Sequence, residues 1–205
     1  MSVRNEVTQM KETAPLLASS KEEIRNEALR RIIETLKSRK EEIFEANRKD
    51  REAARRDHIA PAVMKRLLFD EEKLESLVSG LEQLIRLPDP VGHITLAREL
   101  DAHLKLYRVT CPIGVIGIIF EARPDALVQI SALCIKSANC AILKGGKETK
   151  ETNRILFSLI HEAAVSAGLP EKAWLQAEQH SEIDELLQCE GLVDLLIPPV
   201  SYTHL

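Results

Sequence analysis

The sequence predicts an α/β fold in which N-terminal helices precede a doubly wound parallel sheet. Residues 20–86 carry apolar side chains at helical spacing. From residue 112 onward, short apolar runs of strand length alternate with longer amphipathic segments. This alternation is typical of a parallel sheet with helices on both faces. We therefore expect a helical region over 1–90, a β-hairpin over 91–111 and a Rossmann-like region over 112–198.

The helical region is expected to contain three helices. One long amphipathic helix is predicted over 20–56, where Ser20 and Glu23 have the spacing of a capping box. A second helix is predicted to begin near Pro61, because proline is favoured in the first turn of a helix. A third is predicted after Asp70, where apolar residues form a stripe along one face.

A linker and a pair of strands are expected next. The segment LPDPVG, residues 87–92, combines two prolines and a glycine and should end the third helix. Partial alternation over 93–110 predicts two antiparallel strands. The remaining predicted elements are buried strands over 115–120, 140–143 and 193–197, helices over 125–137 and 149–167, and a short helix that opens at Ser181 and Asp184. Asn139 is expected to adopt the left-handed conformation that ends a helix.

Composition excludes several classes of protein. The 205 residues include 28 Lys plus Arg and 32 Asp plus Glu, so the net charge is −4 and favours neither nucleic acid nor an anionic membrane as a partner. No apolar run approaches the ~18 residues of a membrane span. The first residues lack the apolar core of a signal peptide, so we expect a cytoplasmic protein.

The cysteines and histidines indicate no metal site or catalytic triad. The four cysteines form no CxxC pair and are expected to be buried, reduced thiols. The six histidines are scattered over predicted helices and loops, away from any Ser or Cys nucleophile at a strand end. Each is expected to be a surface residue.

Charged residues gather where the first two buried strands are expected to end. The first of these strands is followed by EARPD, residues 121–125, and the second by KGGKE, residues 144–148. Ligands of open parallel sheets bind beyond the carboxyl ends of the strands. The two segments are therefore the expected place for a ligand.

The residues of the second segment narrow the kind of ligand. The chain has no G-x-G-x-x-G at the strand ends, and Glu148 stands where a P-loop has Ser or Thr, so a nucleoside triphosphatase is excluded. Gly145 and Gly146 allow a ligand to approach the backbone closely. Lys144 is either a cation for phosphate or ribose oxygens or a solvent-facing lysine at a strand end, and the pattern alone leaves both open.

Several segments of the chain match the pattern of one known family. They are PIGVIGIIFEARPD and LKGGKE, then TNRIL, AGLP and VDLLIP, and the earlier LLFDEEKLESLVSGLEQLIRLPDPVG. These segments resemble the γ-glutamyl phosphate reductases, a proline-biosynthesis family of the aldehyde dehydrogenase superfamily. The similarity extends over roughly residues 5–198. It implies an aldehyde dehydrogenase-like cofactor-binding domain with NADP(H) as cofactor. The implied reaction is NADPH-dependent reduction of L-glutamyl 5-phosphate to glutamate 5-semialdehyde, in which a cysteine thiolate attacks the acyl phosphate and hydride reduces the thioester.

The resemblance also implies roles for individual residues. Lys144 matches a lysine that contacts the adenosine ribose and its 2′-phosphate. Arg123 falls where many aldehyde dehydrogenases have an asparagine that stabilises the oxyanion, and an arginine there is expected to neutralise an acyl phosphate. The remaining matches are the turn formed by Gly145, Gly146 and Lys147 and the backbone along the cofactor formed by Phe120, Glu121 and Ala122.

The chain departs from the family pattern after VDLLIP. It reads PVSYTHL, residues 199–205, which we expect to be a non-native tail, and the catalytic domain with the nucleophilic cysteine is expected to be absent. The expected chain is thus a truncated, cofactor-binding fragment of a homo-oligomeric enzyme whose substrate can be channelled from a glutamate kinase. The hairpin near 93–110 resembles the family's assembly element. The alternative is a non-enzymatic binding or dimerisation module built on the same fold.

Overall fold

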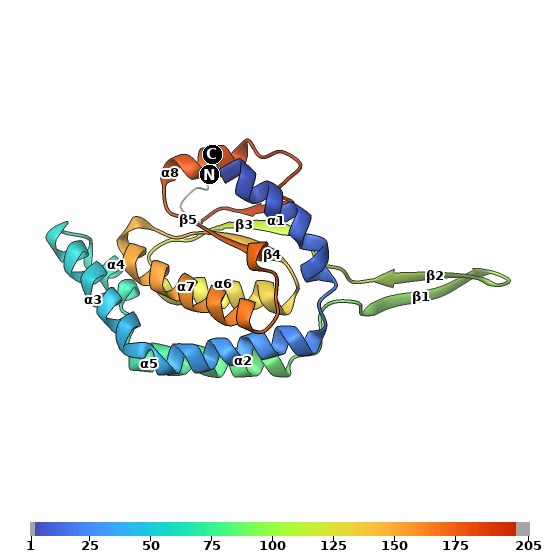
Figure 1. Ribbon diagram of the computed structural model, residues 1–205, viewed down its shortest axis with the longest axis horizontal. Coiled ribbons are helices and arrows are strands. Elements are labelled where there is room, and N and C mark those ends of the chain that lie inside the picture. The colour runs from blue at the N-terminus through green and yellow to red at the C-terminus, as the bar shows by residue number, and fades with distance from the viewer. Residues whose placement is uncertain (1–2, 200–205) are drawn as a thin grey trace.

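The computed structural model describes residues 3–199, in which helices come first and strands and helices then alternate (Figure 1). The helices are α1 (Val3–Ala18), α2 (Glu22–Ser38), α3 (Lys40–Arg56), α4 (Pro61–Leu67), α5 (Glu71–Arg86), α6 (Pro124–Lys136), α7 (Lys150–Ser166) and α8 (His180–Leu187). The strands are β1 (Ile94–Asp101), β2 (Leu104–Val109), β3 (Val115–Ile119), β4 (Cys140–Lys144), β5 (Trp174–Ala177) and β6 (Leu195–Ile197). Two short 3₁₀ turns are η1 (Lys147–Thr149) and η2 (Glu171–Ala173).

The centre of the molecule is a four-stranded parallel sheet in the order β5–β4–β3–β6. Helices α6 and α7 cover one face and α1 covers the other, while α2 and α5 form a further layer outside α6 and α7 (Figure 1). All residues of β4 are buried, because this strand has a neighbour on each side and helices on both faces. The predicted α/β fold with a doubly wound parallel sheet is confirmed.

The prediction of one long helix over 20–56 is wrong, because α2 and α3 are separate helices that meet at Arg39. The break allows α2 to pack on α6 and α7 while α3 packs on α7 and η1. The predicted capping box is also wrong. The Ser20 hydroxyl donates to the Leu17 carbonyl at the end of α1, and Lys21 is the N-cap residue of α2.

Three further features differ from the sequence prediction. Helix α1, which buries Val7, Met10 and Leu17, and the four-residue strand β5 have no predicted counterpart. The strand predicted as buried over 193–197 is the short strand β6, whose residues are exposed or half-buried. The reason is that β6 pairs only with β3 and lies at the edge of the sheet.

The turns at the ends of the long helices also show which residues adopt the left-handed conformation. Gly168, with φ of 98°, follows α7. After α6 the left-handed residue is Ala138, with φ of 55°, and not Asn139 as predicted. Asn139 instead uses its side-chain oxygen to accept the Gly114 N–H at 2.9 Å.

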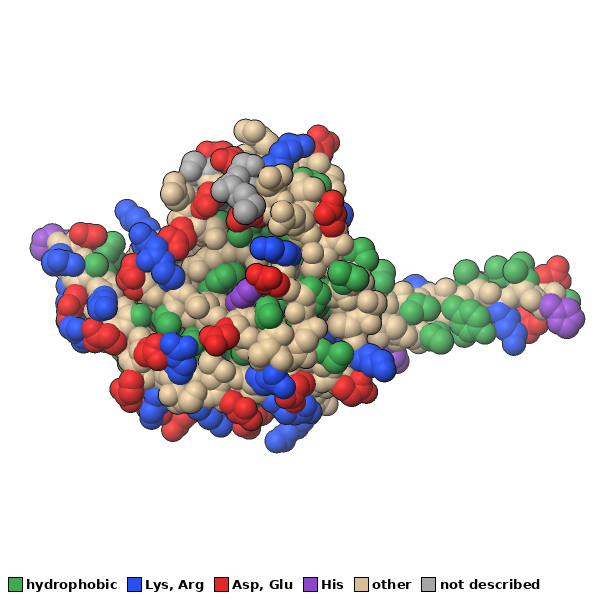
Figure 2. Space-filling view, in the orientation of Figure 1, with side chains coloured by type: hydrophobic (Ala, Val, Ile, Leu, Met, Phe, Trp, Pro, Cys, Tyr) green, Lys and Arg blue, Asp and Glu red, His purple; other side chains and the backbone are tan. Residues whose placement is uncertain are grey.

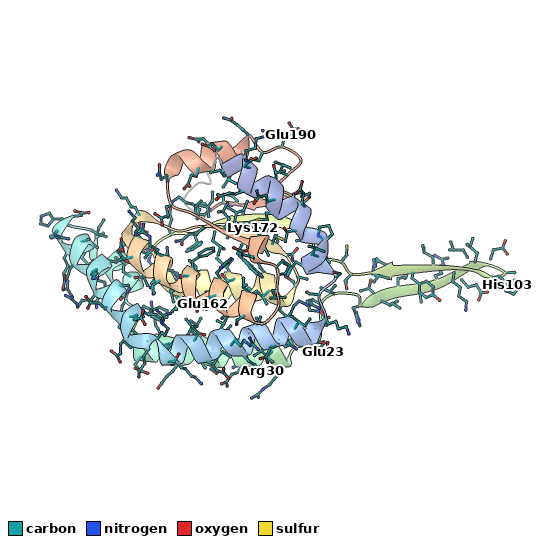
Figure 3. The ribbon with its side chains drawn as sticks, viewed as in Figure 1. Glu23, Arg30, His103, Glu162, Lys172 and Glu190 are labelled. Carbon is teal, nitrogen blue, oxygen red and sulfur yellow. The ribbon has the colours of Figure 1, made fainter. Side chains whose placement is uncertain are left out.

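Strands β1 and β2 form an antiparallel hairpin that projects away from the rest of the chain (Figure 1). Every residue of both strands is exposed, and Figure 2 shows hydrophobic side chains along the projecting arm. His103 lies at its tip (Figure 3). The large exposed apolar residues of the two strands are Ile94, Leu96, Leu100, Leu104, Leu106, Tyr107 and Val109. A hairpin with no cover of its own is marginally stable in water, so this apolar surface is typical of an interaction element.

Candidate functional site

A cleft of about 830 Å³ lies at the carboxyl ends of β3 and β4. It is lined by all seven residues that the resemblance assigns to the cofactor: Phe120, Glu121, Ala122, Lys144, Gly145, Gly146 and Lys147. The structure therefore brings the two charged segments together, as expected for the strand ends of a parallel sheet. The rest of the lining comes from Ile59, Ala60, Val63, Arg66, Glu148 and Glu178 and from Ile119 at the end of β3.

Ala122 is the point at which three parts of the cleft meet. Its N–H donates to the Glu148 carboxylate at 2.7 Å, so a side chain from the turn after β4 holds the loop after β3. Its methyl group is buried in a small apolar cluster with Ala54 of α3 and Leu67 of α4. Its φ of 50° is left-handed, a conformation that an alanine adopts only at a cost. The surrounding contacts offset that cost and fix the loop.

The corner between α3 and α4 is held in place by buried polar groups. Asn47 donates to the Leu67 carbonyl at 2.7 Å and accepts the Phe69 N–H at 3.0 Å. Asp50 accepts the N–H and the hydroxyl of Thr152, at 2.8 and 2.6 Å, at the start of α7. Burial raises the pKa of Asp50, although the hydrogen bonds from Thr152 act in the opposite direction. These contacts join the α4 wall of the cleft to the helix that follows the KGGKE turn.

At Gly145 and Gly146 a side chain would displace the end of a neighbouring side chain. A Cβ at Gly145 would stand 2.0 Å from the side-chain nitrogen of Asn153, and one at Gly146 would stand 2.1 Å from a carboxylate oxygen of Glu148. Asn153 donates to the Thr149 hydroxyl at 2.8 Å, which in turn donates to the Gly146 carbonyl at 3.1 Å. The turn therefore presents fixed backbone to the cleft, which suits a ligand that must come close to the main chain.

Lys144 is a buried lysine, with only 8% of its surface exposed. Its ammonium donates to the Gly145 carbonyl at 2.7 Å, and no described carboxylate lies within ion-pair distance of it. The alternative of a solvent-facing lysine is thus wrong. A buried ammonium without a carboxylate is suited to bind an anionic or hydroxyl-bearing ligand.

Arg123 is not part of this cleft. It is the exposed N-cap residue of α6, and the lining of the cleft does not include it. The chain turns at Ala122, where φ is 50°. Arg123, the next residue, therefore does not join Phe120, Glu121 and Ala122 in lining the cleft. The sequence places Arg123 at the strand exit but does not indicate the direction of its side chain.

None of the four cysteines lies in the cleft. Burial raises the pKa of Cys134 and of Cys140 to about 12, and it also raises the pKa of Cys189. Cys111 is exposed, contrary to prediction, and it precedes β3, where it lines a separate apolar groove of about 560 Å³ with Cys134. No cysteine is therefore placed to act as a thiolate nucleophile at the strand ends.

Sequence reasoning missed the wall that residues 59–66 contribute, together with Glu148 as a bridge and Glu178 at the rim. Glu178 is paired with Arg154 at 2.8 Å, and this hydrogen bond lowers its pKa. Only Pro61 signalled a helix near the wall, and nothing in the local pattern indicated that this helix would face the strand ends. In the part of the chain that the structure describes, no group of His, Cys, Asp and Glu could hold a metal ion.

Similar proteins define the family. A protein of Ruminiclostridium cellulolyticum named gamma-glutamyl phosphate reductase is 49% identical over 89% of this chain and 42% of its own length. One of Acetivibrio thermocellus with the same name is 47% identical over 97% of this chain and 46% of its own length. No protein-family model matches the chain.

Solved structures agree. The gamma-glutamyl phosphate reductase of Thermotoga maritima superposes with a TM-score of 0.91 at 30% identity, over 97% of this chain and 48% of that one. The enzyme of the same name from Saccharomyces cerevisiae superposes with a TM-score of 0.85 at 32% identity, over 98% of this chain and 55% of that one. A probable aldehyde dehydrogenase of Listeria monocytogenes shares the fold. It superposes with a TM-score of 0.68 at 14% identity, over 95% of this chain and 40% of that one.

The fold is the aldehyde dehydrogenase-like fold. The chain is a homologue of the γ-glutamyl phosphate reductases. It spans about half the length of the relatives that it matches. The described part contains no helix of the length and hydropathy needed to span a bilayer, and the tail over 199–205 lies outside the described residues except for Pro199.

Proposed function

We propose that this chain supplies the cofactor-binding part of a γ-glutamyl phosphate reductase that uses NADPH to reduce L-glutamyl 5-phosphate in proline biosynthesis. The observation that carries the proposal is the cleft at the strand ends, where the buried Lys144 meets the side-chain-free turn of Gly145 and Gly146. A dinucleotide needs this combination of a cation and accessible backbone. When bound there, it would supply the hydride for the reaction.

Each residue of the cleft has a definite task under this proposal. Lys144 is positioned to bind the ribose and its 2′-phosphate, which favours NADPH over NADH. The backbone of Phe120 and Glu121 runs along the cofactor, and Glu148 holds that backbone through Ala122. The exposed hairpin favours a homo-oligomer, since its apolar side chains have no described partner within the chain's core.

The test is a fluorescence titration of the chain with NADPH and NADH. Lys144→Ala should weaken NADPH binding by ~1.5–3 kcal/mol, the range for a hydrogen bond to a charged group, and should weaken NADH binding less. The control is Lys172→Ala, because Lys172 is an exposed lysine of η2 that lies outside the lining of the cleft (Figure 3). Equal affinities for Lys144→Ala and the unmodified chain would remove Lys144 from the site.

A second test concerns turnover. We expect no NADPH oxidation when the chain alone meets γ-glutamyl phosphate generated in place by a glutamate kinase. The reason is that no described thiol lines the cleft, and burial raises the pKa of Cys134 and of Cys140 to about 12. Loss of a nucleophile typically costs many orders of magnitude in rate. Robust turnover that one Cys→Ser substitution abolishes would contradict the proposal that this chain is only the cofactor-binding part.

A further inference from the structure

Arg66 is a cation of the cleft that comes from a different wall than Lys144 and Lys147. It lies in the last turn of α4 and is a lining residue of the cleft, together with Ile59 and Val63 of the same corner. The two lysines enter from β4 and the turn after it. A ligand in the cleft would therefore meet positive charge both from α4 and from the end of β4.

No carboxylate of the described chain lies within ion-pair distance of Arg66. Three acidic residues line the cleft, namely Glu121, Glu148 and Glu178. Glu178 is engaged by Arg154, and Glu148 accepts the Ala122 N–H. Arg66 therefore takes part in no described ion pair. An exposed arginine on a helix often contacts only solvent. The case for a binding role of Arg66 therefore depends on how its backbone is held.

The backbone that carries Arg66 is held at two consecutive carbonyls. The Arg66 carbonyl accepts from the Lys73 ammonium at 3.2 Å, and the Leu67 carbonyl accepts from Asn47 at 2.7 Å. Leu67 is fully buried, in the same apolar cluster as Ala122. The base of the Arg66 side chain is therefore fixed relative to the loop after β3, so less conformational entropy is lost when the side chain binds an anion.

The surface beside Arg66 has the same sign of charge. A neighbouring groove of about 400 Å³ is lined by Arg51, Arg55 and Lys65, none of which has a described carboxylate at ion-pair distance. The acidic residues of this part of α3 are engaged elsewhere, since Asp50 caps α7 and Glu52 pairs with Arg48 at 2.5 Å. Positive potential at this rim would raise the local concentration of a polyanionic ligand.

We propose that Arg66 binds a phosphate group of the ligand held in the cleft. The guanidinium presents a planar pair of donors that matches two phosphate oxygens. This inference rests on the proposed function. The phosphate belongs either to the dinucleotide or to the acyl phosphate, and one experiment distinguishes the two.

The experiment compares Arg66→Ala and Arg66→Lys with Arg56→Ala in the full chain. Arg56 is the matched control, because it is an exposed arginine at the end of α3 without a described ion-pair partner and outside the linings of both grooves. Each variant is titrated with NADPH, and then with inorganic phosphate in the presence of saturating NADPH. Thermal unfolding of each variant reports whether the fold is intact.

If the dinucleotide supplies the phosphate, Arg66→Ala weakens NADPH binding roughly 10- to 100-fold, the effect of losing one charge-assisted hydrogen bond. If the acyl phosphate supplies it, NADPH binding is unchanged and inorganic phosphate binding falls by a similar factor. In either case Arg66→Lys recovers part of the loss, Arg56→Ala has no effect, and the unfolding temperatures agree.

Two outcomes separate this inference from the proposed function. Unchanged affinity of Arg66→Ala for both ligands, in a chain that binds NADPH, overturns the role of Arg66 and leaves the proposed function standing. A chain that binds phosphate through Arg66 but does not bind NADPH overturns the proposed cofactor and leaves Arg66 as an anion site. A chain that binds neither ligand overturns both.

Discussion

A carboxylate accepts a backbone N–H near each end of β3, but the charged groups at the two ends differ in their ion pairing. At the amino end, Asp194 accepts the Val115 N–H at 2.8 Å and is paired with Lys11 at 2.5 Å. At the carboxyl end, Glu148 accepts the Ala122 N–H at 2.7 Å, while Lys144 of the same cleft has no described carboxylate partner. Neutralised charge at one end is typical of a structural contact, and cations without a described carboxylate partner at the other are typical of a binding site.

The amino end should therefore respond to substitution through stability. Gly114→Ala is expected to lower the free energy of unfolding by about 3 kcal/mol or more, because strain and overpacking add. Gly114 has φ of 124°, and a Cβ there would stand 2.2 Å from an Asp194 carboxylate oxygen. Urea denaturation measures the loss.

Gly92→Ala is the control for backbone strain alone. Gly92 has φ of 79°, and a Cβ there would meet no atom within 4 Å. We expect this variant to lose about 1–2 kcal/mol. Equal losses for the two glycines would show that the contact with Asp194 does not constrain the amino end.

Asp194→Asn should have the next largest effect, about 1–3 kcal/mol near pH 7, through the weakened contacts with Lys11 and Val115. Burial alone would raise the pKa of Asp194, but the hydrogen bonds from Lys11 and Val115 hold it below its ordinary value of 3.8. The folded state thus binds a proton less readily than the unfolded state. The ionised carboxylate therefore contributes stability above about pH 3.8, and this is lost as the pH falls through the lower folded value.

Urea denaturation of the Asp194→Asn variant and the unmodified chain near pH 7 and near pH 3 checks the sign. The difference between the two proteins should shrink at the lower pH. A difference that grows on acidification would mean that Asp194 is not stabilised as a carboxylate in the folded chain.

The carboxyl end should respond through binding more than through stability. Glu148→Ala removes the acceptor of the Ala122 N–H, a net loss of about 0.5–1.5 kcal/mol. The loop after β3 should then be less well fixed, so NADPH binding weakens and the Ala122 amide exchanges hydrogen faster. Glu148→Gln keeps an acceptor oxygen and should recover much of the effect.

Glu178→Gln is the matched control for Glu148. Glu178 lines the same cleft, but its side chain pairs with Arg154 and does not connect the loop after β3 to the turn after β4. NADPH titration and amide exchange are measured for each variant. An unchanged exchange rate at Ala122 in Glu148→Ala would refute the bridge whatever happens to the cofactor.

Arg123→Ala should have the smallest effect of the series. Arg123 is exposed, makes no side-chain cap for α6 and lies outside the lining of the cleft. We expect a change in unfolding free energy within about 0.5 kcal/mol and an unchanged affinity for NADPH. A tenfold loss of affinity would return Arg123 to the binding site.

The sequence was a good guide to the part of the site that parallel strands build. Strand ends that lie side by side bring Phe120 and Lys144 to one place without any knowledge of the rest of the fold. The α4 wall could not be predicted in this way, because its position depends on contacts between Leu67, Ala54 and Ala122, which are distant in sequence. The direction of the Arg123 side chain could not be predicted either, because strand-end position does not determine it.

The elements that were missed lacked local signals. The break at Arg39 has no proline or glycine, and helical periodicity continues on both sides, so only packing against α6 and α7 reveals it. Strand β5 is four residues long and follows a 3₁₀ turn. A run this short is hard to distinguish from a loop, since strands are usually five or six residues long.

The pairing of Lys11 with Asp194 links residues 183 positions apart. Helix α1 leaves the ribosome early, yet it packs on β3, β4 and α8, and β6 joins the sheet beside β3 only after β4 and β5 have been made. Such long sequence separation slows folding, because the entropy cost of closing a long loop comes before the stabilising contacts form. The apolar face of α1 therefore remains uncovered while more than a hundred residues are synthesised, and this interval is when the growing chain is most exposed to aggregation.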